Sequence, residues 1–130
     1  MELIRKEKIL DSVFYTWVFP EVKTEEDCFR LIYEIASIGD VWGINFRGYG
    51  DMDIHENEVS FRSIKNMKDG LEEIDKVEPD SVDIRMRVGE ENVCVSISPF
   101  GGSEDGVRVS MFDPEEAANY VAGEIEKIGK

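Results

Sequence analysis

Apolar and polar residues alternate along three stretches of the C-terminal half of the chain, between residues 82 and 111. An alternation with a period of two places every second side chain on the same face of a β-strand. Residues 89–92 and 101–106 separate the three stretches and are rich in residues typical of turns. The pattern therefore predicts an antiparallel meander of three strands with one apolar face. The residues of that face would be Val82, Ile84, Met86, Val88, Val93, Val95, Ile97, Val107, Val109 and Met111.

Shorter alternating stretches between residues 41 and 64 predict another meander earlier in the chain. Its strands would cover residues 41–47, 51–54 and 58–64. Its inward side chains would be Trp42, Ile44, Phe46, Met52, Ile54, Val59 and Phe61. Residues 12–19 are aromatic and β-branched, which favours a further strand that ends at Pro20. The charged residues 2–10 fit a helix or a strand equally well.

Helical spacing of apolar residues indicates three helices. Thr24, which three acidic residues follow, is a typical N-cap, and the helix behind it would end at Gly39. The second helix, at about residues 65–77, would bury the stripe Met67, Leu71, Ile74 and Val77. The third would begin with Asp113 as its N-cap and Pro114 as its first helical residue. Its apolar face would consist of Ala117, Ala118, Val121, Ile125 and Ile128.

Together these elements predict a single α+β domain that spans residues 1–130. A chain of 130 residues is long enough to bury a core without disulfides or metals. The two three-strand meanders would form the antiparallel sheet, and the C-terminal helix would pack on the second meander. We expect the core to be centred on Ile32, Ile35, Ile84, Val95, Val109, Val121 and Ile125.

The charge of the chain is strongly negative, because 29 acidic residues outnumber 15 basic ones and give a formal net charge of −14. Small soluble domains usually carry a net charge of about 2 to 8 in magnitude. A negative field of this size repels nucleic-acid phosphates and anionic membranes, and it attracts basic proteins. The alternative interpretation is that the acidity serves solubility alone. The acidic surface includes Glu72, Glu73 and Asp75 on the polar side of the second helix.

The stretch RGYGDMDIHEN, residues 47–57, contains the only histidine of the chain. If residues 51–54 form a strand, then Asp51, Asp53 and His55 share one face, as metal ligands could. An EF-hand loop needs glycine at its sixth position and glutamate at its twelfth, where this chain has Glu56 and Arg62. The stretch therefore predicts the rim of a hairpin, with no metal and no cofactor.

The polar face of the later meander is the best candidate for a ligand site. Arginines on neighbouring strands can bind a carboxylate or a phosphate. The alternative is a solvated face with Arg–Asp pairs between the strands. Tyr49 and Phe100 border glycine-containing turns, so we expect them to be exposed and available to a partner. The candidate binding residues are Arg85, Arg87, Arg108, Ser96, Ser98, Tyr49 and Phe100.

Catalytic chemistry has little support in the sequence. A nucleophile paired with histidine would have to use His55, and no motif marks a serine or cysteine as activated. Cys28 and Cys94 have no companions at metal-ligand spacing, and two cysteines suit a reducing cytoplasm better than a disulfide framework. The apolar run at residues 13–19 is too short to span a membrane.

The sequence therefore favours a non-enzymatic, acidic protein-binding module of the inhibitor, immunity or chaperone kind. Its partner would be a protein with a basic surface, and neither nucleic acid nor a membrane. One alternative is a small-ligand binder or minor enzyme that uses the Arg/Ser face of the later meander. Another is a structural subunit of a larger assembly, and the sequence also leaves a homodimer open.

Overall fold

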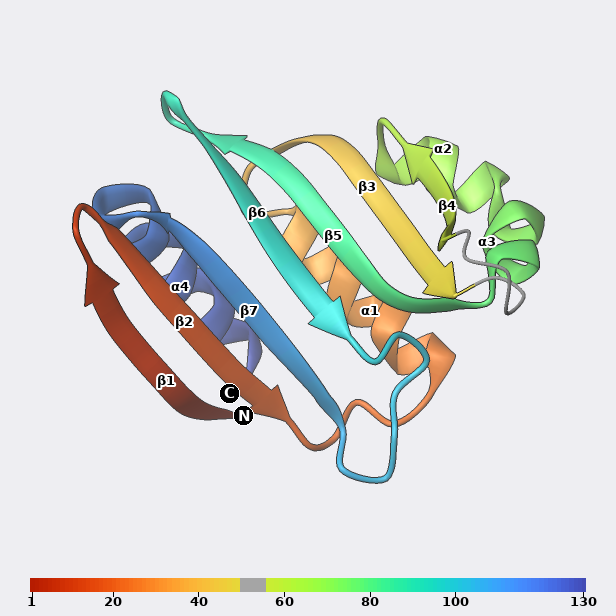
Figure 1. Ribbon diagram of the computed structural model, residues 1–130, viewed down its shortest axis with the longest axis horizontal. Helices are drawn as coiled ribbons and strands as arrows, with labels where there is room; N and C mark the ends of the chain where they lie inside the picture. Colours follow the sequence, from red (N-terminus) through yellow and green to blue (C-terminus); the bar gives the residue numbers. More distant parts are fainter. Residues whose placement is uncertain (50–55) are drawn as a thin grey trace.

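One antiparallel sheet of seven strands runs through the computed structural model, which describes residues 1–49 and 56–130. The strands lie in the order β1-β2-β7-β6-β5-β3-β4 (Figure 1). Their bounds are β1 Glu2–Ile9, β2 Ser12–Phe19, β3 Asp40–Tyr49, β4 Glu56–Phe61, β5 Pro79–Val88, β6 Glu91–Ser98 and β7 Val107–Pro114. The helices are α1 Glu25–Ala36, α2 Ile64–Asp69, α3 Leu71–Val77 and α4 Glu115–Ile128. The predicted α+β domain with an antiparallel sheet is confirmed.

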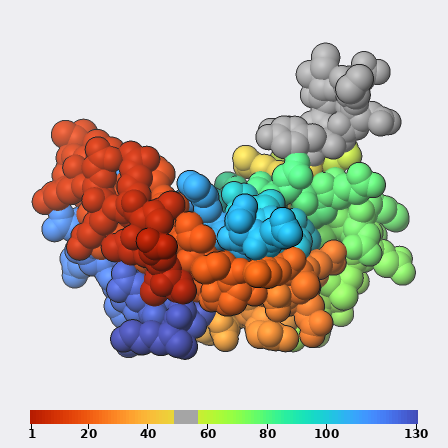
Figure 2. Space-filling view, turned by 90° about the horizontal axis from the view of Figure 1, so that it is seen from below, coloured from red at the N-terminus to blue at the C-terminus, as the bar shows by residue number. Residues whose placement is uncertain are grey.

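The two longer helices, α1 and α4, cover one face of the sheet and leave the other face open (Figure 1). In Figure 2 they lie side by side on the same side of the molecule, α4 in blue and α1 in orange. Alternate residues of each central strand enter the core beneath them, as a half-buried sheet requires. The seven residues predicted at the centre of the core are all fully buried.

The C-terminal helix packs on β2 as well as on the predicted meander. Its main neighbours are β2 and β7, because β2 lies beside β7 in the sheet. The aromatic side chains of β2 also bond to this helix. Tyr15 Oη donates to Asn119 Oδ1 at 2.6 Å, and Trp17 Nε1 donates to Glu126 Oε1 at 3.4 Å. The prediction missed this contact because strand order cannot be read from alternation alone.

The predicted layout of two meanders is wrong in part. The described strands of the earlier group are the β3–β4 hairpin, which joins β5 in the same sheet, and the predicted strand 51–54 lies outside the described residues. Trp42 was expected to point inward but is 50% exposed. The register shifts there, because Val41 pairs with Met86 while Gly43 pairs with Arg85. Trp42 is thus the extra residue of a β-bulge, which alternation does not reveal.

The predicted second helix is two short helices, so the chain has four helices in its described part and not three. Gly70 caps both α2 and α3. A Cβ atom at this glycine would collide with the ring of Phe61, so the chain needs glycine where it passes that ring. The interruption also changes the helical phase. Leu71 is 45% exposed as a result, whereas Met67, Ile74 and Val77 are buried as predicted.

The ends of the other elements follow the local sequence only in part, since α1 ends at Ala36 with Ser37 as its C-cap and not at the predicted Gly39. Thr24 caps α1 in a complete capping box with Asp27, as the acidic first turn predicts. Residues 2–9 form the edge strand β1, which pairs with β2 alone in the described structure. The predicted N-cap of the last helix is wrong, because Pro114 is the N-cap of α4 and Asp113 still lies within β7.

Candidate functional site

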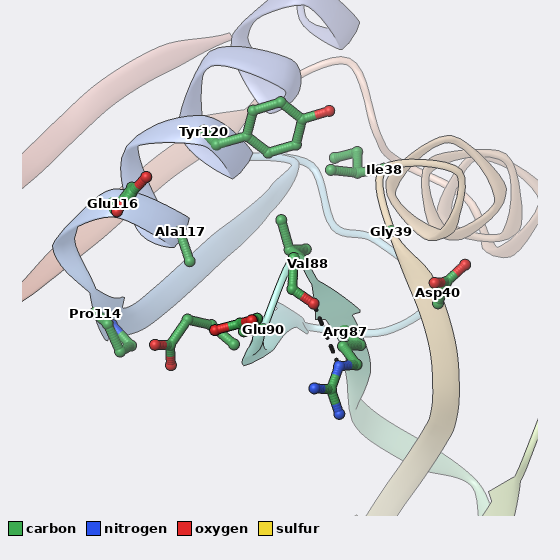
Figure 3. Close-up of a pocket in the computed structure, with 12 residues that line it drawn as sticks. Ile38, Gly39, Asp40, Arg87, Val88, Glu90, Pro114, Glu116, Ala117 and Tyr120 are labelled. Atoms are coloured by element: carbon green, nitrogen blue, oxygen red, sulfur yellow. Dashed lines mark hydrogen bonds between the residues drawn. The ribbon is translucent and has the colours of Figure 1, made fainter.

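A hollow of the described surface lies where β6 and β7 part. Their paired residues end at Val95 and Met111, and the next amide along β6, Cys94 N–H, donates to Asp113 Oδ2 at 3.3 Å. Beside this point a pocket of about 700 Å³ opens between the end of α1, the β5–β6 turn and the start of α4 (Figure 3). We call it the hairpin pocket. Its lining residues are Ile38, Gly39, Asp40, Arg87, Val88, Gly89, Glu90, Glu91, Pro114, Glu116, Ala117 and Tyr120.

The hairpin pocket combines apolar walls with carboxylates. Ile38, Val88 and Tyr120 gather at one end of it in Figure 3, and Tyr120 is 53% exposed. Four acidic residues in its lining, Asp40, Glu90, Glu91 and Glu116, are all exposed. The one cation in the lining, Arg87, directs its guanidinium away from that apolar end, and its Nε donates to the Gly89 carbonyl at 3.3 Å. The pocket is therefore open and negative, with apolar side chains at one end.

Two smaller hollows, of about 290 and 300 Å³, continue the hairpin pocket along the α1–α4 boundary. The first shares Ile38 and Tyr120 with the hairpin pocket, and the second shares Glu34 and Ile128 with the first. We call the three hollows together the acidic groove. Its lining includes eight acidic residues, namely Glu21, Asp27, Glu34, Asp40, Glu90, Glu91, Glu116 and Glu124.

Three cations line the acidic groove, and carboxylates of the same helices already engage two of them. Lys127 Nζ lies 3.1 Å from Glu124 Oε1 on α4. Arg30 lies 3.5 Å from Glu26 Oε1 and 3.7 Å from Asp27 Oδ1 on α1. The third cation is Arg87, whose Nε is bonded to a carbonyl. The groove therefore has an excess of carboxylates beside apolar residues, which suits a segment with both apolar and basic side chains.

A buried carboxylate stands next to the hairpin pocket. Asp113 is only 8% exposed, and burial raises its pKa to about 6 even though the Cys94 amide donates to it. Burial disfavours the charged form of a carboxyl group, and a donated hydrogen bond favours it. Desolvation is the larger of the two effects here. This burial could not be predicted from the sequence, because Asp113 before Pro114 has the pattern of a helix cap.

The three arginines predicted to converge on the open sheet face are spread along it. Arg85 pairs with Cys94, whereas Arg108 pairs with Ser98. Four residues of β6 separate these positions, or roughly 13 Å at the usual rise of a strand. Arg87 lies farther still from Arg108, opposite Asn92. The structure therefore does not bring Arg85, Arg87 and Arg108 together.

Asp83 is the centre of the polar contacts on the open face. The Nη2 atoms of Arg85 and of Arg47 each lie 3.9 Å from Asp83 Oδ2, and Ser96 Oγ donates to Asp83 Oδ1 at 2.6 Å. Arg47 comes from β3, so the sequence pattern of the later meander could not include it. Ser98 is exposed beside Arg108. These contacts match the solvated face with Arg–Asp pairs that was the alternative to a ligand site.

A row of polar residues crosses the open face through six strands. Its members face one another in the register and are Thr16, Ser110, Ser96, Asp83, Asn45 and Ser60. Three hydrogen bonds join neighbours in pairs, including Ser60 Oγ to Asn45 Oδ1 at 2.7 Å and the contact of Thr16 with Ser110 at 3.4 Å. The row satisfies its own polar atoms, which makes it a structural feature of the sheet.

The two aromatic residues expected at exposed turns do not form an exposed pair in the described structure. Phe100 is buried at 9% exposure, so the prediction that it is exposed is wrong. Its ring packs edge-on against Phe29 and Phe46, with centroids 5.3 and 5.2 Å away. Tyr49 ends β3, and its side chain lies outside the described part of the chain.

The acidic residues predicted on the second helix are exposed on α3. Glu72, Glu73 and Asp75 flank the buried side chain of Ile74. None of the three lines the acidic groove. They therefore contribute to the field of the protein without belonging to this surface.

A dedicated metal site is not expected. Asp51, Asp53 and His55 lie outside the described residues, and residues 1–49 and 56–130 contain no group of three or more His, Cys, Asp or Glu side chains placed to hold an ion. We predict that excess chelator leaves the melting temperature unchanged, because no stabilising ion would be removed. Differential scanning calorimetry with EDTA, followed by addition of Ca²⁺ or Zn²⁺, measures this. A drop of several degrees that one of the two ions restores would contradict the prediction.

No protein-family model matches the sequence, and neither a curated protein nor a solved structure shows significant similarity to it. No helix of the described residues is long and apolar enough to cross a membrane. What the protein does must therefore be argued from the chemistry of its own surface.

Proposed function

We propose that the protein is a non-enzymatic binding module of the inhibitor, immunity or chaperone kind, and that the acidic groove receives a basic segment of a protein partner. The observation that carries the proposal is the composition of the groove. Eight acidic residues line it beside apolar side chains such as Leu31 and Ile128, and its few cations are already engaged. Charge complementarity of this kind selects a cationic partner.

The charge of the whole molecule supports the same partner class. A net charge of −14 repels phosphates and anionic lipids at long range and raises the encounter rate with a cationic surface. The proposal therefore includes no measurable binding to duplex DNA or RNA at physiological salt. A cytoplasmic location is part of the proposal too, since both cysteines are free and suit a reducing compartment.

Two alternatives have less support. A ligand site on the Arg/Ser face would need arginines that converge, but Arg85 lies close to Asp83 and Arg108 is paired four residues farther along β6. A homodimer could pair β1 with its copy, because β1 is an edge strand, although Arg5 and Lys8 are already in ion pairs with Glu7 and Glu115. Edge strands are commonly protected against such pairing by lysines and by β-bulges, and β1 has both, with the bulge between Leu3 and Arg5.

Two variants with equal charge change test the proposal. The groove variant is Glu34→Gln, Glu116→Gln and Glu124→Gln, and the control is Glu72→Gln, Glu73→Gln and Asp75→Asn on α3. The partner is captured at low salt, purified to homogeneity and assayed by surface plasmon resonance. Both variants should slow association, because both weaken the long-range field. Only the groove variant should also speed dissociation, by about tenfold, because short-range contacts govern that rate.

The outcomes distinguish binding in the acidic groove from long-range attraction by the net negative charge. Faster dissociation of the control variant alone would place the contact surface on α3 and contradict the groove. Association rates that neither variant changes would contradict the electrostatic role of the acidic residues. Melting curves of both variants should stay close to that of the wild type, and the small cost of losing first-turn carboxylates is shared, at Glu116 on α4 and at Glu72 and Glu73 on α3.

A further inference from the structure

We infer that the hairpin pocket accepts a single lysine or arginine side chain of the partner and so anchors the basic segment in the acidic groove. The inference rests on the proposed function and deepens it. It assigns a specific subsite within the acidic groove.

The shape of the pocket suits a long cationic side chain. Lysine and arginine bury an apolar stem and keep their charged end near water or carboxylates. In the hairpin pocket the apolar part is provided by Ile38 of the α1–β3 loop, Val88 of β5 and Ala117 of α4. The stem of the guest side chain would pack there, because these residues offer it no competing polar group.

The charges of the pocket suit the end of the same side chain. Glu90 and Glu91 stand at the β5–β6 turn and Glu116 at the first turn of α4, so carboxylates approach from both sides of the opening. The Arg87 guanidinium is directed away from the apolar end (Figure 3), and Lys127 in the adjoining hollow is paired with Glu124. The exposed ring of Tyr120 adds an aromatic surface, to which a cation is also attracted.

The pocket is larger than one side chain, which indicates how the rest of the segment lies. Its volume of about 700 Å³ is in the range of pockets for complete small ligands. Ile38 and Tyr120 line both this pocket and the next hollow along α4. A segment anchored here would therefore continue from the hairpin pocket towards Ile128, with room for residues next to the anchor.

Capped tripeptides test the subsite without the partner. The probes are Gly-Arg-Gly and Gly-Lys-Gly, and the control is Gly-citrulline-Gly, which has nearly the shape of the arginine peptide but no charge. In ¹⁵N-resolved NMR titrations, both cationic peptides should shift the amides of Gly39, Gly89 and Ala117 in a saturable manner. The amide of Glu73 on α3 should not move, and the citrulline peptide should shift none of these signals.

Three variants give the test its specificity. Glu90→Gln, Glu91→Gln and Glu116→Gln together should weaken binding of the arginine peptide at least tenfold. The matched control, Glu72→Gln, Glu73→Gln and Asp75→Asn, should weaken it less than twofold. Tyr120→Ala should also weaken binding of the arginine peptide severalfold, although it does not change the charge. Tyr120 is exposed, so this variant should keep the fold.

Each contrary result overturns the inference in its own way. Equal shifts with the citrulline peptide would mean that the pocket does not recognise charge. Equal losses in the two triple variants would mean that only the diffuse field attracts the peptides. In both cases a partner whose association still depended on salt would leave the proposed function standing. A salt-independent association would instead refute the proposed function itself.

Discussion

Replacement of Ile84 by alanine is expected to lower the free energy of unfolding by about 2–4 kcal/mol, the usual loss for a large-to-small change in a core. Ile84 is fully buried in the middle of β5, between Ile44 of β3 and Val95 of β6. Neighbours on both sides are held by strand pairing, so they cannot close in on the space that the side chain leaves. Chemical denaturation with a two-state fit measures the change.

The matched control for this experiment is the same substitution on the edge strand. Ile9 is 40% exposed on β1, so Ile9→Ala removes less buried surface and should cost less than half as much. A denaturation midpoint that Ile84→Ala does not move would mean that the inner and outer faces of β5 have been exchanged.

Replacement of Asp113 by asparagine is expected to raise stability at neutral pH by up to about 3 kcal/mol. The pKa of Asp113 is about 6 in the folded protein, against an ordinary value of 3.8. The folded state thus holds a proton between pH 4 and 6 that the unfolded state has released. Stability from this group is therefore highest below about pH 4 and declines as the pH rises to 6. Asparagine keeps an acceptor for the Cys94 amide but carries no charge to bury.

The pH dependence separates this cause from a simple packing effect. The difference in unfolding free energy between variant and wild type should be near zero at pH 4, grow up to about pH 6 and stay constant above it. Urea denaturation at each pH measures it, and taking the difference cancels the titration of the many other carboxyl groups. A variant that is less stable than the wild type at pH 7 would contradict the burial of a charged carboxylate.

Most of the fold could be predicted from the sequence where a local pattern determines it. Alternation identified the inner faces of β5, β6 and β7, and the capping box at Thr24 marked the start of α1. The alternation failed at Trp42, where one extra residue enters the strand without any change in composition. The helical stripe failed at Leu71, since the break at Gly70 depends on the distant ring of Phe61.

The candidate site could not be predicted, because no local pattern contains it. Its residues come from the segment between α1 and β3, the β5–β6 hairpin and the start of α4, and they meet only once the order of the strands is known. The open sheet face was easier to see, since every second residue of three strands lies on it. The burial of Phe100 could not be predicted from its local sequence either. Its flanking glycines indicate a turn, but packing against Phe29 and Phe46 buries it.

The association rate of the purified partner as a function of salt tests most directly whether the acidity serves partner binding. The Debye length, over which charges attract before salt screens them, is about 30 Å at 0.01 M ionic strength and about 8 Å at 0.15 M. Long-range attraction is therefore largely lost between these conditions. With −14 charges on the protein, we predict that the association rate falls roughly tenfold or more over this range while the dissociation rate changes little. An association rate that stays constant across the same range would contradict the account and leave solubility as the role of the acidic residues.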